Sequence, residues 1–133
     1  MERQLGRFAP QIHAITRILA GIMFACHGAQ KLFGAFGPMP AEMPAVLLYT
    51  AGVIELFGGL AIAAGLYTSW AAFLASGFMA AAYFMAHAPQ GFWPVQNRGE
   101  LAILYCWYFL GLAATGGGIW SADAAMGKKP AST

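Results

Sequence analysis

Four long apolar segments constrain this chain more than any other feature of its sequence. They cover residues 12–33, 44–66, 68–87 and 100–120, and each approaches the ~20 residues that a helix needs to cross a bilayer core. Only 9% of the 133 residues are charged and 59% are hydrophobic, whereas a soluble domain carries about 25% charged residues. So little charge indicates a surface that contacts lipid, and the sequence therefore predicts an integral membrane protein.

The four segments are predicted to be helices with short connections. A barrel strand would be about half as long and would alternate polar with apolar residues. Glycine and proline fill the first connection, 34–44, and Pro44 suits the start of a helix because its missing N–H costs nothing there. The connection at 67–69 is so short that the second and third helices must be antiparallel neighbours. We therefore predict a single all-α domain over residues 1–133, an integral membrane four-helix bundle followed by a tail at 121–133.

The positive charges predict which side of the membrane holds the termini. An even number of spans places both termini on one side, together with Arg3, Arg7, Lys128 and Lys129. Apart from a lysine at a helix end, the opposite loops contain only Arg98. The positive-inside rule therefore predicts a cytoplasmic location for both termini and for the tail. A cleaved signal peptide is the alternative interpretation of the N-terminus, but its apolar run continues past any cleavage site and three more segments follow.

Ionisable residues within the apolar segments are the candidates for function. A charge at mid-membrane costs roughly 2.5–3.5 kcal/mol, so each one needs a partner, a route to the interface or a function. In the first segment, Arg17, His27 and Lys31 fall within an arc of about 80° when each residue turns the helix by 100°. This polar stripe is predicted to face the interior of the bundle.

Depth along the segments sorts the polar residues into two predicted groups, each containing both signs of charge. The cytoplasmic group is an ion pair of Arg17 and Asp123, with Ser121 near it. The outer group is centred on Glu55, in the middle of the second segment, and has His87 close by. Its other members are His27, Lys31, Asn97, Arg98 and Glu100. Mutual neutralisation within each group is expected.

Most of these residues also have a purely structural interpretation. Lys31 could extend its ammonium group to the outer interface and do nothing else. Glu100 is favourable as an end charge at a helix N-terminus, and His87 and Arg98 are expected to be interfacial. Glu55 ranks first for function, because no short carboxylate reaches water from the middle of a span.

Other kinds of site receive less support. Cys26 and Cys106 lie at similar depth near the outer ends of their segments, which would allow a reversible disulfide or a quinone-linked thiol pair. There is no C-x-x-C motif, however, and a free cysteine is usually a small buried hydrophobe. The three histidines lie on different segments without H-x-x-x-H or E-x-x-H spacing, so no metal or haem site is predicted. The formal charge of +2 predicts no nucleic-acid partner.

Four stretches carry polar motifs in a recognisable order. They are RILAGIMFACHGAQKLFG (Arg17–Gly34), GVIELFGGLAIAAGL (Gly52–Leu66), AHAPQGFWPVQNRGELAILY (Ala86–Tyr105) and GGIWSAD (Gly117–Asp123). With their HG-x-x-K, E-x-x-GG, N-x-G-E and S-x-D elements, they resemble the DoxX family of small membrane proteins over nearly the whole chain. The resemblance implies a multi-pass four-helix protein of a bacterial-type inner membrane. It also implies the polar positions Arg17, His27, Lys31, Glu55, Asn97, Glu100 and Asp123.

The resemblance further implies a link to membrane redox chemistry. The family is named after a subunit of a thiosulfate:quinone oxidoreductase, and relatives are linked to redox complexes and oxidative stress. We therefore expect a subunit without its own haem, flavin or metal motif, with quinone as the candidate cofactor and a protein partner that supplies the electron carrier. Beside the lipid bilayer, the expected partner is another protein or further copies of this chain in a homo-oligomer. One alternative function is that of a structural or assembly partner whose charges only fix helix packing. The other is a carrier that couples a small solute to protons on Glu55 and His27.

Overall fold

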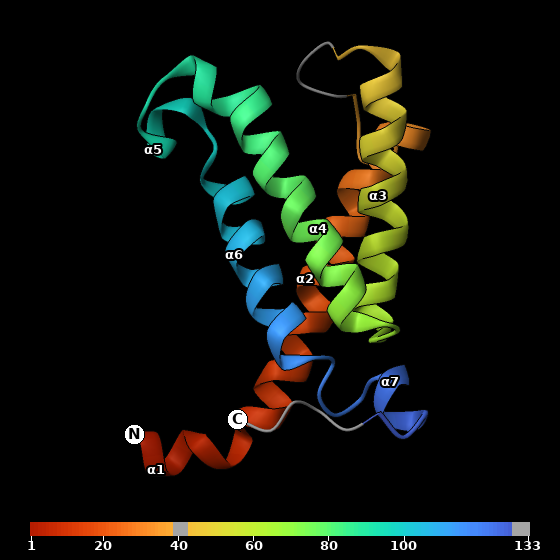
Figure 1. Ribbon diagram of the computed structural model, residues 1–133, viewed down its shortest axis with the longest axis vertical. Helices are drawn as coiled ribbons and strands as arrows, with labels where there is room; N and C mark the ends of the chain where they lie inside the picture. The colour runs from red at the N-terminus through yellow and green to blue at the C-terminus, as the bar shows by residue number, and fades with distance from the viewer. Residues whose placement is uncertain (39–42, 129–133) are drawn as a thin grey trace.

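The regular structure is helical throughout residues 1–38 and 43–128, the part of the chain that the computed structural model describes. The bundle consists of four helices (Figure 1): α2 (Ala9–Phe33), α3 (Ala45–Ala64), α4 (Thr68–Ala82) and α6 (Glu100–Thr115). The short elements are α1 (Glu2–Leu5), the 3-10 turns η1 (Gly6–Phe8) and η3 (Ala88–Gln90), the π-helical turn η2 (Tyr83–His87), α5 (Pro94–Asn97) and α7 (Ala122–Ala125). The prediction of an all-helical chain is therefore confirmed.

Within residues 1–38 and 43–128, three helical runs are long and apolar enough to cross a membrane: Glu2–Phe33, Ala45–Ala64 and Thr68–Gln90. The fourth apolar helix, α6, has 16 residues, about 24 Å at 1.5 Å per residue, against about 30 Å of bilayer core. The predicted extension of this helix to residue 120 is wrong. Gly116 and Gly118 have positive φ angles of +76° and +64°, which a right-handed helix does not contain, and these conformations end the helix.

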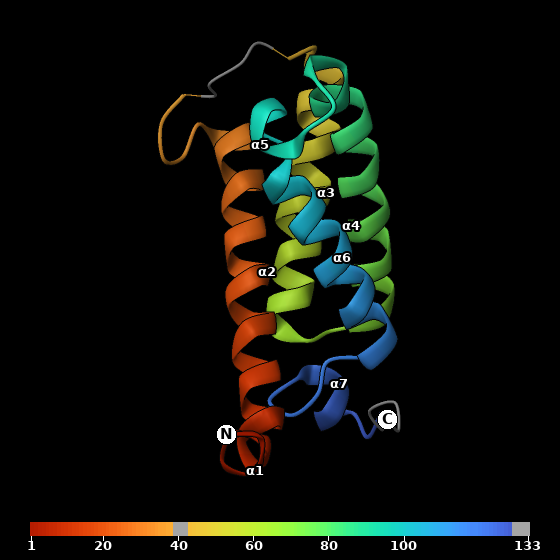
Figure 2. The same ribbon diagram turned by 90° about the vertical axis from the view of Figure 1, so that its left-hand side faces the viewer.

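The helices pack as two close pairs that share a core. Helix α2 lies along α3, and α4 lies along α6, with the tight α3–α4 connection joining the pairs (Figure 2). Phe24, Ile62 and Phe109 are buried where the pairs meet. Helices α1 and α7 lie at the same end of the bundle (Figures 1 and 2), and the opposite end, which carries α5, is called the outer end below. The cytoplasmic location of the α1 and α7 end stays a prediction, and Lys129 lies outside the described residues.

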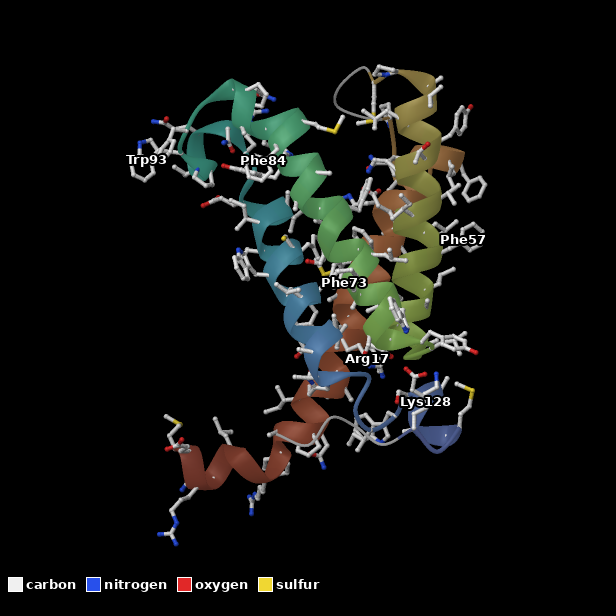
Figure 3. All side chains as sticks on the ribbon, in the orientation of Figure 1. Arg17, Phe57, Phe73, Phe84, Trp93 and Lys128 are labelled. Carbon is white, nitrogen blue, oxygen red and sulfur yellow. The ribbon has the colours of Figure 1, made fainter. Side chains whose placement is uncertain are left out.

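Large apolar side chains cover the outside of the bundle. Phe57 and Trp93 project away from the helices (Figure 3), and Leu74 and Leu104 are 66% and 67% exposed. A soluble monomer rarely exposes a contiguous apolar surface of this kind, because water makes it costly. A bilayer removes that cost, so the apolar exterior fits a protein embedded in lipid.

Glycines allow α2 and α3 to approach until their backbones touch. A methyl group added at Gly21 would lie 2.7 Å from the carbonyl oxygen of Gly59, and one added at Gly59 would lie 2.6 Å from the carbonyl oxygen of Gly21. Small residues at such contacts gain dispersion energy from the close approach, which drives helix association in lipid. Glycine thus permits the tight packing of this pair of helices.

Replacement of Gly59 by alanine is expected to lower the free energy of unfolding by about 2 kcal/mol, because the added methyl group collides with backbone that cannot rotate away. Gly77 on α4 is the matched control, since a methyl group there meets nothing within 4 Å. Gly77→Ala is expected to leave stability unchanged or slightly higher, because alanine is the better helix former. Unfolding by SDS in mixed micelles, followed by circular dichroism, compares the two variants. Equal midpoints would contradict the tight contact.

Candidate functional site

At the end of the bundle that carries α1 and α7, the buried side chain of Arg17 donates hydrogen bonds to four backbone carbonyls. Its Nε donates to Gly117 at 2.9 Å, and its Nη2 donates to Trp120 at 2.8 Å. Its Nη1 donates to Ile62 at 2.7 Å and to Ala63 at 2.5 Å, in the last turn of α3. The last carbonyls of a helix lack partners within the helix, and a guanidinium group is suited to supply several donors at once. We call Arg17 and these four carbonyls the Arg17 clamp.

Asp123 caps the beginning of α4 from a distant part of the chain. Its carboxylate accepts hydrogen bonds from the backbone N–H groups of Tyr67, at 3.0 Å, and Thr68, at 2.8 Å, and from the Thr68 hydroxyl at 2.8 Å. Lys128 adds an ion pair at 3.0 Å. Burial alone would raise the pKa of Asp123, but the hydrogen bonds from Thr68, Lys128 and Tyr67 outweigh it and lower the pKa to about 2. The carboxylate therefore stays ionised at neutral pH.

The structure does not form the predicted ion pair between Arg17 and Asp123. Among the described residues the salt bridges are Lys31–Glu55 and Lys128–Asp123. The two ends of the α3–α4 connection explain the difference: the arginine donates to carbonyls in the last turn of α3, while the aspartate accepts from N–H groups at the beginning of α4. Ser121 serves as the N-cap of α7 by accepting a hydrogen bond from the N–H of Ala124.

The outer half of the bundle contains an ion pair between α2 and α3. Lys31 Nζ lies 2.5 Å from Glu55 Oε2, and the two side chains are only 11% and 6% exposed. Close packing of the helices at Gly28, where an added methyl group would lie 2.7 Å from the Gly52 carbonyl oxygen, brings the two side chains into reach. Lys31 therefore turns inward to a partner, and the alternative in which it only reaches the interface does not describe this structure.

A cavity of about 160 Å³ adjoins this ion pair and is lined by further ionisable groups. We call it the outer cavity. Its lining residues are Phe24, His27, Lys31, Glu55, Met79, His87, Arg98, Leu101, Ala102 and Tyr105. In the Arg17 clamp the guanidinium group donates to backbone carbonyls. In the outer cavity, by contrast, a carboxylate, an ammonium, a guanidinium and two imidazoles line an open space. Such a set can hold an oxygen-rich ligand and exchange protons with it.

Two members of the predicted outer group do not line the cavity. Asn97 is buried and organises the loop before α6: it donates to the Gly91 carbonyl at 2.8 Å and to the Tyr83 hydroxyl at 3.3 Å, and it accepts the N–H of Gly99 at 2.8 Å. Glu100 is exposed at the first position of α6, where the helix dipole favours a carboxylate. The structural interpretation therefore fits both residues better.

Three cavity residues differ from the expectation or were missed. His87 and Arg98 were expected to be interfacial, but a π-helical turn carries His87 to the cavity, and Arg98 adopts a left-handed conformation with a φ of +58°. His87 Nδ1 lies 2.9 Å from the Asn97 carbonyl oxygen, which fixes the ring. Tyr105 is not among the predicted site residues, although a hydroxyl group four residues before Phe109, on the same buried face of α6, is a signal that the sequence contains.

Neither cysteine forms a disulfide in the described part of the chain. Cys26 and Cys106 are both free and partly buried. The Ser76 hydroxyl donates to the Cys106 carbonyl at 2.8 Å and lies 3.7 Å from its sulfur. A redox role for this pair stays a prediction.

The fold and the outer cavity define a small helical membrane protein with a polar site between its helices. The chain matches the family model described as DoxX over residues 12–88. It is also 39% identical, over 131 residues, to an uncharacterized protein of Haemophilus influenzae (strain ATCC 51907 / DSM 11121 / KW20 / Rd), with 94% of this chain and 98% of that protein covered. No solved structure is significantly similar. The chain therefore belongs to the DoxX family.

Proposed function

We propose that this protein is an inner-membrane subunit of a redox system and that its outer cavity binds the ring of a quinone. The observation that carries the proposal is the cavity itself, where ionisable side chains surround a volume of about 160 Å³ inside an apolar bundle. A protein cavity of about 150 Å³ accommodates one benzene ring. The outer cavity is thus of the size that a single six-membered ring requires.

The lining residues supply the proton chemistry that quinone reduction needs. Reduction to the quinol consumes two electrons and two protons. A partner protein bearing a flavin or an iron–sulfur centre supplies the electrons. Glu55 and His27 are the groups through which the protons pass, and Lys31 and Arg98 place positive charge around a ring whose oxygens become more negative as electrons arrive.

A structural role is the second candidate, and the Lys31–Glu55 ion pair favours it. The two charges neutralise each other, so they could serve only to fix α2 against α3. The Arg17 clamp has this character, because all of its hydrogen bonds go to backbone carbonyls. The outer cavity differs because His27, His87 and Arg98 also face it.

Binding of decylubiquinone to the purified protein in nanodiscs tests the proposal, with protein-free nanodiscs as the correction for partition into lipid. Wild-type protein is expected to bind saturably, and His27→Gln to weaken binding about tenfold through the loss of a cavity-facing imidazole. Glu100→Gln is the matched control on the same side of the membrane, because Glu100 does not line the cavity. Absence of saturable binding to wild-type protein, or equal weakening by both substitutions, would refute the proposed site.

A further inference from the structure

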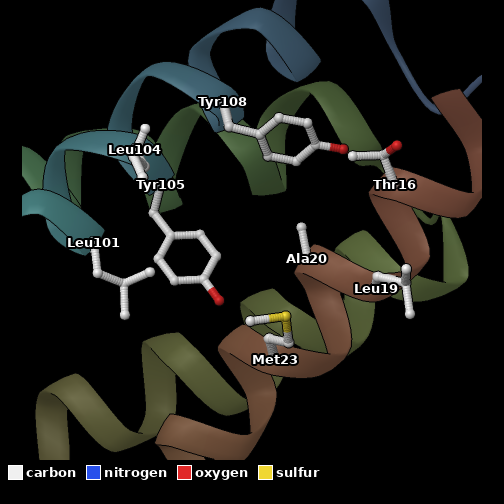
Figure 4. A pocket seen from close by; sticks show the side chains of 8 residues that line it. All are labelled: Thr16, Leu19, Ala20, Met23, Leu101, Leu104, Tyr105 and Tyr108. Atoms are coloured by element: carbon white, nitrogen blue, oxygen red, sulfur yellow. The ribbon is translucent and has the colours of Figure 1, made fainter.

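An apolar groove runs along the bundle where α2 faces α6. Its volume is about 290 Å³, and its walls come from these two helices alone. Figure 4 shows its lining residues Thr16, Leu19, Ala20 and Met23 on α2, and Leu101, Leu104, Tyr105 and Tyr108 on α6. Helices α2 and α6 belong to different close pairs, which explains why a space remains between them. We call it the α2–α6 groove.

The groove adjoins the outer cavity through shared residues. Leu101 and Tyr105 line both spaces. The outer walls of the groove are exposed on the bundle surface, since Met23 is 54% and Leu104 is 67% exposed, and in the membrane these side chains meet lipid. A molecule dissolved in the bilayer could therefore pass between α2 and α6 and reach the polar cavity without crossing water.

Tyr105 carries an unpaired polar group at the junction of the two spaces. The residue is only 6% exposed, and its hydroxyl is buried without a hydrogen-bond partner among the described residues. In Figure 4 this hydroxyl points across the groove toward α2. A buried hydroxyl without a partner is costly, so a ligand that offers an oxygen acceptor at this place would recover the lost hydrogen bond.

We infer that the α2–α6 groove is the lateral entrance of the quinone site, that the isoprenoid chain of the quinone lies in it, and that the Tyr105 hydroxyl donates a hydrogen bond to a ring carbonyl. The inference rests on the quinone site proposed above. The occupant follows from the chemistry of the two spaces: an apolar chain for the apolar groove, and a ring with carbonyl oxygens for the polar cavity. Both parts can belong to one molecule because the two spaces are neighbours that share Leu101 and Tyr105 as wall residues.

A matched pair of leucines tests the entrance. Leu104 lines the groove and is 67% exposed, whereas Leu74 on α4 is 66% exposed and does not line it. Leu104→Trp fills the groove and is expected to weaken binding of decylubiquinone about tenfold, while Leu74→Trp leaves it unchanged. The second probe is 2,3-dimethoxy-5-methyl-1,4-benzoquinone, which has the same ring without the long chain, and its binding is expected to be the same in both variants.

The outcomes separate the entrance from the site. If both probes bind wild-type protein but decylubiquinone binds the two tryptophan variants equally, the proposed entrance is refuted and the proposed quinone site is retained. If neither probe binds wild-type protein, the quinone site and the entrance fail together.

Tyr105→Phe tests the hydrogen bond, and it should fold because it removes only an unpartnered hydroxyl. The substitution is expected to weaken the binding of both probes about fivefold, which corresponds to the loss of one hydrogen bond of about 1 kcal/mol. Tyr49→Phe, at an exposed position on α3, is the control and is expected to leave the binding of both probes unchanged. Unaltered binding in Tyr105→Phe would overturn the assignment of this hydroxyl.

Discussion

Replacement of Arg17 by methionine is expected to destabilise the protein by on the order of 4 kcal/mol, about 1 kcal/mol for each of the four hydrogen bonds that are lost. Methionine fills most of the apolar space that the arginine stem occupies, so the loss reports the hydrogen bonds more than packing. Two of these carbonyls end α3, and the other two belong to the segment before α7. The clamp therefore ties the α3–α4 connection to the C-terminal part of the chain.

The matched control is Arg7→Met, the same substitution at an exposed arginine in η1, where a change within about 0.5 kcal/mol is expected. SDS unfolding gives the free energies, and hydrogen exchange adds a local measurement. In Arg17→Met the amides of Tyr67 and Thr68 are expected to exchange faster, because the Asp123 carboxylate that accepts them is held by the same segment. If Arg17→Met unfolds like Arg7→Met, the clamp does not stabilise the fold.

Removal of one partner of the Lys31–Glu55 pair is expected to cost about 3 kcal/mol, whereas removal of both costs much less. Glu55→Gln leaves a buried ammonium without a counter-charge, and Lys31→Met leaves a buried carboxylate. The double variant contains neither charge, so its stability is expected to return to within about 1 kcal/mol of wild type. Lys128→Met is the control at an ion pair whose lysine is 47% exposed, and it should change stability by less than about 1 kcal/mol.

The same double variant separates a functional pair from a structural one. If the outer cavity binds quinone, the folded double variant is expected to bind decylubiquinone at least about tenfold more weakly, because the cavity has lost both charges. If the pair only fixes helix packing, the stable double variant keeps the affinity of the wild type. Retained affinity together with restored stability would favour the structural alternative.

The candidate site could be predicted in part, and each difference has a physical cause. The stripe of Arg17, His27 and Lys31 follows from helical periodicity, which one segment specifies by itself. The predicted pairing of Arg17 with Asp123 is wrong because it rests only on the similar depth of the two residues in the membrane. Charges at the same depth need not pair when unsatisfied backbone groups at helix ends offer closer partners.

The loops were less predictable than the helices. His87 reaches the outer cavity through a π-helical turn, and Arg98 reaches it through a left-handed backbone conformation. Neither conformation has a reliable signature in a single sequence, since arginine is not a residue that usually adopts positive φ. Asn97 is buried, as the sequence predicts, but its hydrogen bonds go to the loop and not to the cavity.

The sequence by itself determined that this chain lies in a membrane and is helical, because hydrophobicity and helical periodicity accumulate locally along each segment. It also determined which residues would be costly to bury. Only the tertiary structure decided which of them meet, since that depends on how each helix is rotated against its neighbours and on the turns between helices. The contact of α2 with α3 pairs Lys31 with Glu55, and the separation of α2 from α6 opens the groove. Both arise between segments, where no single stretch of sequence contains the information.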